Sequence, residues 1–292
     1  MSAIARPSDS LTPWDKVQLA RHPQRPHTLD YVRYLCSNFF ELRGDRCYAD
    51  DRAIVGGVGQ TPLGSVVVVG HQKGRTLKEN VHHNFGMPHP EGFRKAQRLM
   101  RYAEKFGMPL ICLLDTPGAQ PSLQAEERGQ AQAIAQSLLA MASLEVPIVA
   151  VVIGEGSSGG ALALGIADRL LMLEHAIYAV ASPEASAAIL WRDAAKACEA
   201  ACTMKITAQD LLEFGVIDEI IPEPAGGAHA DPEATITATV AGIFHHLAEL
   251  QSQERQQLVW DRYAKYRAIG QFRRAQELLL ETYAGEFQMA EH

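Results

Sequence analysis

The sequence predicts an α/β fold in which parallel strands are joined by helices. Two stretches, residues 107–119 and 145–157, share one form: a proline near the start, a run of branched apolar residues, a glycine-containing loop and then a helical segment. An amphipathic helical pattern over 91–107 precedes the first stretch. Consecutive strand–loop–helix units imply parallel strands with helical crossovers. Both loops would then lie at the carboxyl edge of the sheet, where ligands bind in open α/β folds.

Composition is that of an ordinary globular protein. The 292 residues suffice for one large domain or two small ones, with 47% apolar and 21% charged residues. A net charge of −7 does not favour binding to nucleic acid or to an anionic membrane. No apolar run is long enough to span a bilayer, and the N-terminus lacks a signal-peptide core. We therefore expect a cytoplasmic protein.

The five cysteines are scattered and include no Cys-x-x-Cys pair. We predict neither a disulfide framework nor a zinc ribbon, and no metal site in this chain. Cys198 and Cys202 lie one helical turn apart, and we expect them to serve packing. Adjacent His82 and His83 would point in different directions, so we do not interpret them, or His89, as metal ligands.

The N-terminal part combines polar and basic segments. Residues 1–13 are expected to be disordered, 14–20 to begin a helix, and Thr28 to cap a helix over 29–40. The prolines between 21 and 27 predict irregular backbone. This segment carries a basic patch, which we interpret as a solvated loop, with a dock for an acidic ligand or partner as the alternative: Arg21, His22, Arg25 and His27.

The middle of the chain predicts a β-hairpin followed by the two strand–helix units. Apolar runs over 53–59 and 65–70 flank a turn, and the second leads into a basic, glycine-containing loop over 71–75. That loop is a second candidate for presenting backbone N–H groups. The remaining units are a helix 91–107, a strand 109–114, a loop 115–119, a helix 125–144 and a strand 146–152.

The C-terminal part alternates short elements and ends in helices. We expect a short helix to 167, strands over 169–173 and 177–181, a helix starting at 182, and a helix end, glycine and strand over 211–221. From residue 231 onward the pattern is helical.

The stretch 146–165 is the most informative one. Its β-branched run enters six glycine and serine positions and then good helix formers, so backbone N–H groups face open space and suit an anion or an oxyanion. Gly154, Gly156 and Gly159 match a dinucleotide fingerprint, with Glu174 as the ribose acid. Ser158 matches a hydrolase nucleophile elbow. The other two interpretations are an oxyanion hole from the Gly159 and Gly160 amides, and glycines that only permit close packing.

Several longer motifs follow one another in the order of a single family. They are ARHPQRPHTLDYV, DRAIVGG, GHQKGR, NFGMPHPEGFRKAQRLM, DTPGA, AEERGQ, IGEGSSGGALALG and IPEPAGGAH. Over roughly residues 14–230 the chain resembles the alpha subunit of the carboxyltransferase component of bacterial-type acetyl-CoA carboxylase.

The resemblance implies a crotonase-like fold, in which ββα units wind into a spiral of two near-perpendicular sheets with flanking N- and C-terminal helices. It divides the chain into a disordered N-terminus (1–13), a carboxyltransferase domain (14–230) and a C-terminal helical extension (231–292). The implied reaction moves a carboxyl group from carboxybiotin, on the biotin carboxyl carrier protein, to acetyl-CoA. The product is malonyl-CoA for fatty acid synthesis.

The resemblance also implies a site and partners. The amides of Gly159 and Gly160 would form the oxyanion hole facing biotin. Other residues would bind biotin or line its pocket: Lys73, Gly74, Arg75, Gly118, Ala119, Gly156, Ser157 and Ser158. A zinc-containing beta subunit would supply the acetyl-CoA side in an α2β2 assembly, alongside the carrier protein and biotin carboxylase.

The sequence departs from the family pattern at Gln120 and at three glycine positions, now Ser122, Ser157 and Ala185. A replaced glycine that needs positive φ would carry strain. Family members also carry further N-terminal helices, and this sequence begins near their end. One alternative that follows is a weakened or specialised non-catalytic assembly partner. The other, based on the elbow match, is a serine hydrolase using Ser158 with His229 and Asp218.

Overall fold

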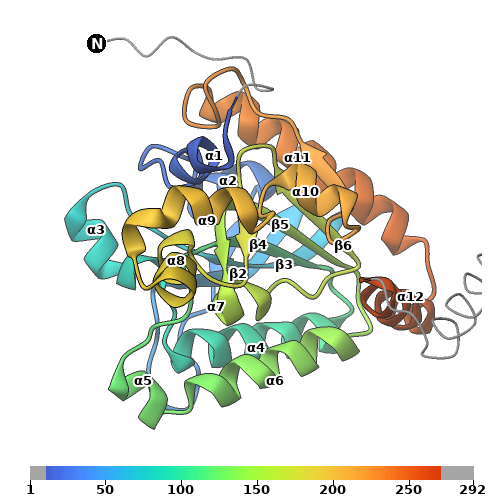
Figure 1. The fold of residues 1–292 in the computed structure, drawn as a ribbon. Coiled ribbons are helices and arrows are strands. Elements are labelled where there is room, and N and C mark those ends of the chain that lie inside the picture. Colours follow the sequence, from blue (N-terminus) through green and yellow to red (C-terminus); the bar gives the residue numbers. More distant parts are fainter. Residues whose placement is uncertain (1–10, 271–292) are drawn as a thin grey trace, which may run out of the picture.

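Eight strands form one mixed sheet in the computed structural model, which describes residues 11–270 (Figure 1). The strands are β1 (Phe39–Glu41), β2 (Ile54–Thr61), β3 (Gly64–His71), β4 (Leu110–Thr116), β5 (Ile148–Ser157), β6 (Arg169–Leu173), β7 (Ile177–Ala179) and β8 (Glu219–Ile221). Their order is β1-β2-β3-β4-β5-β6-β8, with β7 paired to β5. The β1–β2 and β2–β3 pairs are antiparallel and all the others are parallel. The predicted hairpin and the two parallel strand–helix units are both confirmed.

Strand β5 is longer than predicted and pairs in two places. Its residues 149–152 pair with β6, and its last three residues, Glu155–Ser157, pair with β7. Gly154 and Gly156 therefore lie inside a strand, not in a loop. The resemblance implied two sheets. The described strands form one connected sheet, because β5 pairs with β6 through residues 149–152 and with β7 through residues 155–157.

Helices cover both faces of the sheet (Figure 1). They are α1 (Pro13–Ala20), α2 (Thr28–Leu35), α3 (Leu77–His82), α4 (Pro90–Phe106), α5 (Leu123–Glu127), α6 (Gln130–Ser143), α7 (Ser158–Leu162), α8 (Pro183–Trp191), α9 (Ala197–Thr203), α10 (Ala208–Glu213), α11 (Pro232–Gln251) and α12 (Arg255–Ala268). Helices α2 and α11 contact each other, as do α4 and α6. Figure 1 places the short α7 next to the α4–α6 pair, with α8 on its other side.

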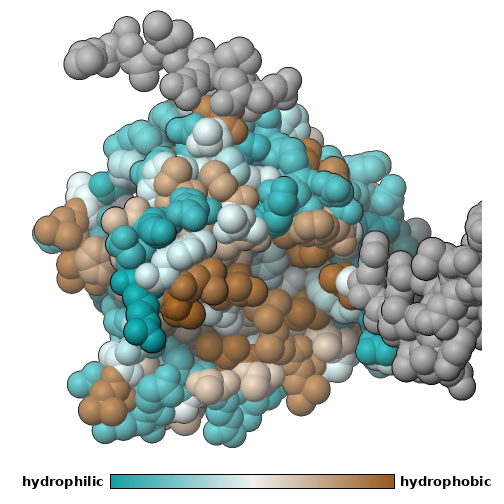
Figure 2. All heavy atoms as spheres, viewed as in Figure 1, coloured by the Kyte–Doolittle hydropathy of each residue, from teal (hydrophilic) through white to brown (hydrophobic). Residues whose placement is uncertain are grey.

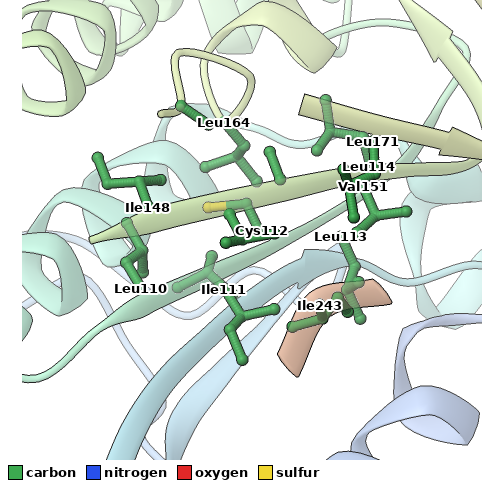
Figure 3. Packing of buried hydrophobic residues seen from close by; sticks show 14 of the residues in the cluster. Leu110, Ile111, Cys112, Leu113, Leu114, Ile148, Val151, Leu164, Leu171 and Ile243 are labelled. Atoms are coloured by element: carbon green, nitrogen blue, oxygen red, sulfur yellow. The ribbon is translucent and has the colours of Figure 1, made fainter. Parts of the chain in front are cut away.

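The core lies on both sides of β4 and β5. Every residue of these two strands is buried, which fits strands covered by helices on both faces. Figure 3 shows Leu164 on one side of the two strands and Ile243 of α11 on the other. The α11 residues Ile243 and Leu247 belong to the same buried cluster as the strands.

Two predicted helices differ at their ends. Thr28 is the first residue of α2 instead of its cap, because its hydroxyl is buried and donates to the His71 carbonyl at 2.5 Å. The helix stops at Leu35, since the following residues lead into β1. The helix predicted over 125–144 is divided into α5 and α6 at Gly129, whose φ of +84° is left-handed.

The cysteine pair does not pack in the core. Cys198 and Cys202 on α9 are both exposed free thiols, so the packing prediction for them is wrong. Cys36 and Cys112, in contrast, are buried. Burial raises the pKa of Cys36 to about 11, which keeps this thiol protonated and unreactive at neutral pH.

A buried arginine is one of the side chains that tie helix α12 to the sheet. Arg262 is 1% exposed and donates to both carboxylate oxygens of Asp168, at 2.8 and 3.0 Å. It also donates to the carbonyls of Met141, Leu144 and Val146. Asp168 accepts the Ile148 N–H at 2.7 Å, so this cluster fixes the start of β5.

Parts of the predicted terminal segments, residues 1–10 and 271–292, lie outside the described residues, and the domain boundaries stay predictions. Within 11–270, no helix combines the length and apolar character needed to cross a bilayer.

Candidate active site

Two loops meet at the carboxyl edge of the sheet. The loop after β4 contains Gly118 and Ala119, and the turn after β5 opens α7 at Ser158. A Cβ placed on Gly160 would lie 2.6 Å from the Ala119 nitrogen and 2.6 Å from the Gly118 carbonyl carbon. The two backbones therefore touch, and only glycine fits at 160. The structure thus brings together four of the predicted site residues.

The amides of Gly159 and Gly160 are free to bind a ligand. Neither N–H donates to an acceptor within the described part of the chain. The N-cap residue, Ser157, gives α7 no side-chain hydrogen bond, unlike the threonine and serine caps of α1, α3 and α8. The Ser157 hydroxyl is itself buried without a partner. The first N–H groups of a helix lack partners within the helix, but a buried one without any partner is rare. Gly160 is buried and Gly159 half-buried, so these two amides are candidates for binding an acceptor.

The changed glycine positions carry no backbone strain. Ser122 and Ser157 have φ of −87° and −119°, and Ala185 has no positive φ either. Ser122 instead caps α5 by accepting the Ala125 N–H. The residue of the turn after β5 that has a left-handed backbone is Ser158, with φ of +58° and an exposed side chain. The condition for strain at the replaced glycines, a positive φ, is therefore not met.

A buried network of charges lies at the ends of β4 and β5. Asp115, with a side chain 2% exposed, accepts from Lys73 Nζ at 2.7 Å and lies 3.3 Å from His27 Nδ1. Burial acts to raise the pKa of Asp115, but the Lys73 ammonium and His27 outweigh it and hold the pKa well below its usual range. This carboxylate is therefore ionised at any physiological pH.

The network continues toward α8. Glu155 accepts from Arg21 at 2.7 Å, and Arg21 also binds Glu184 at 2.6 Å. Lys73 Nζ is 3.8 Å from the second oxygen of Glu155. Arg21 and Lys73 thus link the carboxylates of Asp115, Glu155 and Glu184 into one network.

The basic patch near the N-terminus is not a solvated loop. Arg25 is 1% exposed, forms an ion pair with Glu223 and donates to the Ile153 carbonyl at 2.6 Å. His22 stacks on His229 with ring centroids 3.6 Å apart. Both interpretations of the patch fail for Arg25, because its charge is already used inside the molecule. It holds the 223–229 segment against β5.

Two residues of the 71–75 loop are also committed within the chain. The Gly74 N–H donates to Asn80 at 3.0 Å, and the Arg75 N–H donates to Glu79 at 2.8 Å. The Arg75 guanidinium pairs with Asp30 at 2.6 Å. The N–H groups of Gln72, Gly74 and Arg75 are therefore all bonded within the chain, which does not favour the predicted second N–H site in this loop.

His71 lies directly under the Gly160 turn. It is fully buried, and its ring interacts with the backbone of Gly160 and Leu113. Burial lowers its pKa to about 4, so the ring is neutral.

We expect His71 to make the protein sensitive to acid. Because its folded pKa is about 4 and its ordinary value is 6.5, the unfolded chain binds the proton first as pH falls. Stability is therefore lost between pH 6.5 and 4, by about 3 kcal/mol in all. The measurement is urea unfolding at pH 7 and pH 5. His71→Leu is expected to show the smaller loss, and equal losses in both proteins would contradict the assignment.

The hydrolase and dinucleotide interpretations are not supported. Asp218 pairs with Lys265 and accepts the Leu170 N–H, whereas His229 stacks on His22, so neither is placed to activate Ser158. The helix after the glycines has five residues, and Glu174 accepts the Glu223 N–H. Two of the four interpretations remain: an oxyanion hole from the Gly159 and Gly160 amides, and glycines that permit close packing, which is what Gly160 does against Gly118 and Ala119.

Apolar side chains surround α7 on the surface. Figure 2 shows them gathered over the central face, where Figure 1 places α7 between α8 and α6. Exposed apolar residues of α6, α7, α8 and the segment after β7 are Leu139, Leu162, Val180, Ile189 and Leu190. Val180 is 85% and Ile189 76% exposed, which is typical of surfaces that bind another protein.

Comparison with known proteins decides the family. Residues 3–270 match the family described as acetyl co-enzyme A carboxylase carboxyltransferase-like. The acetyl-coenzyme A carboxylase carboxyl transferase subunit alpha of Heliobacterium modesticaldum is 57% identical over 260 residues, which is 89% of this chain and 78% of that protein. The same subunit of Anoxybacillus flavithermus is 56% identical over 268 residues, covering 92% and 82%.

The chain belongs to the acetyl-CoA carboxylase carboxyltransferase alpha-subunit family. As a carboxyltransferase subunit it is part of an enzyme, and its fold is crotonase-like. Solved structures agree on the fold: transcarboxylase 12S has a TM-score of 0.64 at 19% identity, over 93% of this chain and 46% of that one. A Pseudomonas malonate decarboxylase hetero-tetramer in complex with coenzyme A has a TM-score of 0.63 at 17% identity, over 86% and 97%.

Sequence analysis did not identify Asp115 or Glu155 as individual residues of the carboxyltransferase site. Asp115 and Glu155 each follow a buried apolar run at the end of a parallel strand. A carboxylate at the end of a buried parallel strand, in a chain that also has a basic segment at residues 21–27, was the available signal for this network. It did not reveal that Arg21, His27 and Lys73 would converge there.

Proposed function

We propose that this subunit holds the oxygen of the biotin ring while a carboxyl group passes from carboxybiotin to acetyl-CoA, giving malonyl-CoA. The observation that carries the proposal is the pair of unbonded N–H groups of Gly159 and Gly160. Family membership indicates a biotin-linked carboxyl donor. The ring oxygen becomes negative when its carboxyl group leaves, and such an oxygen is what two convergent N–H donors stabilise.

The residues of the chain fit this role without a side-chain nucleophile. The contact between Gly160 and the Gly118–Ala119 backbone fixes one amide, so the donors need no rearrangement during the reaction. Gly159 faces Ile134 of α6, with its virtual Cβ 3.4 Å from that side chain. With a partner covering the turn, this apolar side chain would help to exclude water, which would strengthen hydrogen bonds to the developing charge. Gly156 pairs with Thr116, and Ser157 and Ser158 lead the chain into the turn.

The alpha subunit works with a beta subunit, and we propose how the site is completed. The chain corresponds to 46% of the transcarboxylase 12S chain, so a second polypeptide would supply the other half. The exposed apolar residues around α7 give that polypeptide a surface beside the amides. A zinc-containing beta subunit would bring the acetyl-CoA side in an α2β2 assembly. The biotin carboxyl carrier protein, loaded by biotin carboxylase, would enter between the two subunits.

Reconstitution tests the proposal. Mixed with a matching beta subunit, the chain is expected to convert malonyl-CoA and biocytin to acetyl-CoA in the reverse reaction. The chain alone, and the beta subunit alone, should not. Complex formation is followed separately by sedimentation. A stable complex that shows no biocytin-dependent loss of malonyl-CoA would contradict the proposed activity.

A further inference from the structure

The ladder between β4 and β5 is interrupted directly under the two amides. Leu114 pairs with Val152, and the next pair is Thr116 with Gly156. Between these pairs β4 advances by two residues (116 − 114) and β5 by four (156 − 152). Asp115 is therefore the one β4 residue opposite the extra length of β5. Such irregularities bend a strand and often lie beside active sites.

The Asp115 carboxylate fills this interruption. Its Oδ1 accepts the Glu155 N–H at 3.1 Å and the Lys73 ammonium at 2.7 Å. A Cβ on Gly154 would lie 2.6 Å from the same oxygen, so a glycine there lets the carboxylate reach β5. Its Oδ2 lies 3.3 Å from His27 Nδ1. Four segments of the chain are thus joined through one side chain.

Both halves of the amide site begin next to this carboxylate. On β4, the hydroxyl of Thr116 accepts the Gly118 N–H at 3.0 Å and donates to the Gly118 carbonyl at 2.8 Å. On β5, the bonded Glu155 leads through two residues to the turn at Ser158. The Gly118–Ala119 backbone then touches Gly160. A change in the position of Asp115 would move the two touching backbones relative to each other.

We propose that Asp115, held by Lys73, is a positioning residue that sets the Gly159 and Gly160 amides for the carboxyl transfer. The role in carboxyl transfer rests on the proposed function. The claim that Asp115 fixes the backbone around Gly159 and Gly160 does not depend on it. Lys73 acts on Asp115 here and not on the biotin ring directly: its Nζ is 2.7 Å from one buried carboxylate and 3.8 Å from another. A buried carboxylate without its cation would be unfavourable, so the two side chains act as a unit.

The test compares Asp115→Asn with Asp168→Asn. Asp168 is a matched control because it is 4% exposed, pairs with Arg262 and binds a backbone N–H at the opposite end of the same strand. In the isolated chain, Asp115→Asn is expected to speed hydrogen exchange about tenfold or more in peptides covering residues 153–160. Asp168→Asn is expected to change exchange near residue 148 instead.

In the reconstituted complex, Asp115→Asn is expected to lower kcat for the biocytin-dependent reaction about 100-fold. The KM for malonyl-CoA, which the partner binds, should stay within about twofold. Asp168→Asn should change thermal stability while leaving kcat near the wild-type value. If Asp115→Asn does not fold, Lys73→Met is measured in the same way. Because the two side chains act as a unit, the kcat of the double variant Lys73→Met/Asp115→Asn should be no lower than that of the less active single variant.

Each outcome has a distinct meaning. Wild-type exchange at 153–160 in Asp115→Asn, or an unchanged kcat, overturns the positioning role. A Lys73→Met loss that is much larger than the Asp115→Asn loss, with raised KM for biocytin, shows that Lys73 binds biotin directly and also overturns it. If exchange at 153–160 is faster in Asp115→Asn but the wild-type complex shows no carboxyltransferase activity, Asp115 still positions the amides. The proposed reaction is then rejected instead.

Discussion

Gly160→Ala is expected to reduce kcat of the reconstituted carboxyltransferase about 100-fold or more, while Gly159→Ala retains most of it. An alanine Cβ at 160 would meet the Gly118 and Ala119 backbone at 2.6 Å, so one of the two loops must move. At Gly159 the nearest atoms belong to the Ile134 side chain, at 3.4 and 3.5 Å, which is ordinary contact. Loss of one oxyanion donor typically costs about 10²–10³ in kcat.

The two variants control for each other, since each adds one methyl group to the same turn. The measurement is the reverse reaction at saturating malonyl-CoA and varied biocytin, with thermal unfolding of each isolated chain. Equal activity of the two variants would show that contact between the loops does not set the amides. A loss confined to Gly159→Ala would place the reacting oxygen on the Ile134 side.

Arg262→Met is expected to lower the free energy of unfolding by about 3–5 kcal/mol, the largest effect on stability among the predictions. The variant leaves the Asp168 carboxylate buried without a cation and three carbonyls without a donor. The cluster joins α12 to the start of β5, so its loss also weakens the attachment of α12, which Tyr266 and Lys265 still bond to Gly165, Ala167 and Asp218. The measurement is urea unfolding at pH 7, followed by far-UV circular dichroism.

A double variant separates charge from packing. Arg262→Met with Asp168→Asn removes the unpaired charge and keeps a carbonyl oxygen for the Ile148 N–H. It should be more stable than Arg262→Met alone. If the single variant loses less than about 1 kcal/mol, the ion pair is not what holds α12.

The strands and the amide site followed from local sequence. The β-branched run before the glycines could only be a buried strand, and β5 begins there. A strand that ends in small residues and continues into a helix leaves its first N–H groups unpaired, which made Gly159 and Gly160 candidates. The choice among four interpretations of this turn came from the family resemblance. Periodicity also set α4, whose end at the left-handed Gly107 matches the prediction.

Other features depend on chain segments far apart. Helix α2 begins at Thr28 because the hydroxyl of this residue bonds to β3, a contact that no local rule contains. The exposed pair Cys198 and Cys202 lies on a helix whose opposite face meets α1, and the sequence did not show which face would be covered.

The sequence by itself determined the parallel α/β core, the turn at Ser158 and the family to which the chain belongs. Tertiary structure alone decided that Asp115 meets Lys73, 42 residues away, and His27, 88 residues away, and that Arg21 reaches Glu155 across 134 residues. The physical reason is that helix and strand patterns arise between near neighbours. The pairing of buried charges depends on strand order and register, which only the folded sheet fixes.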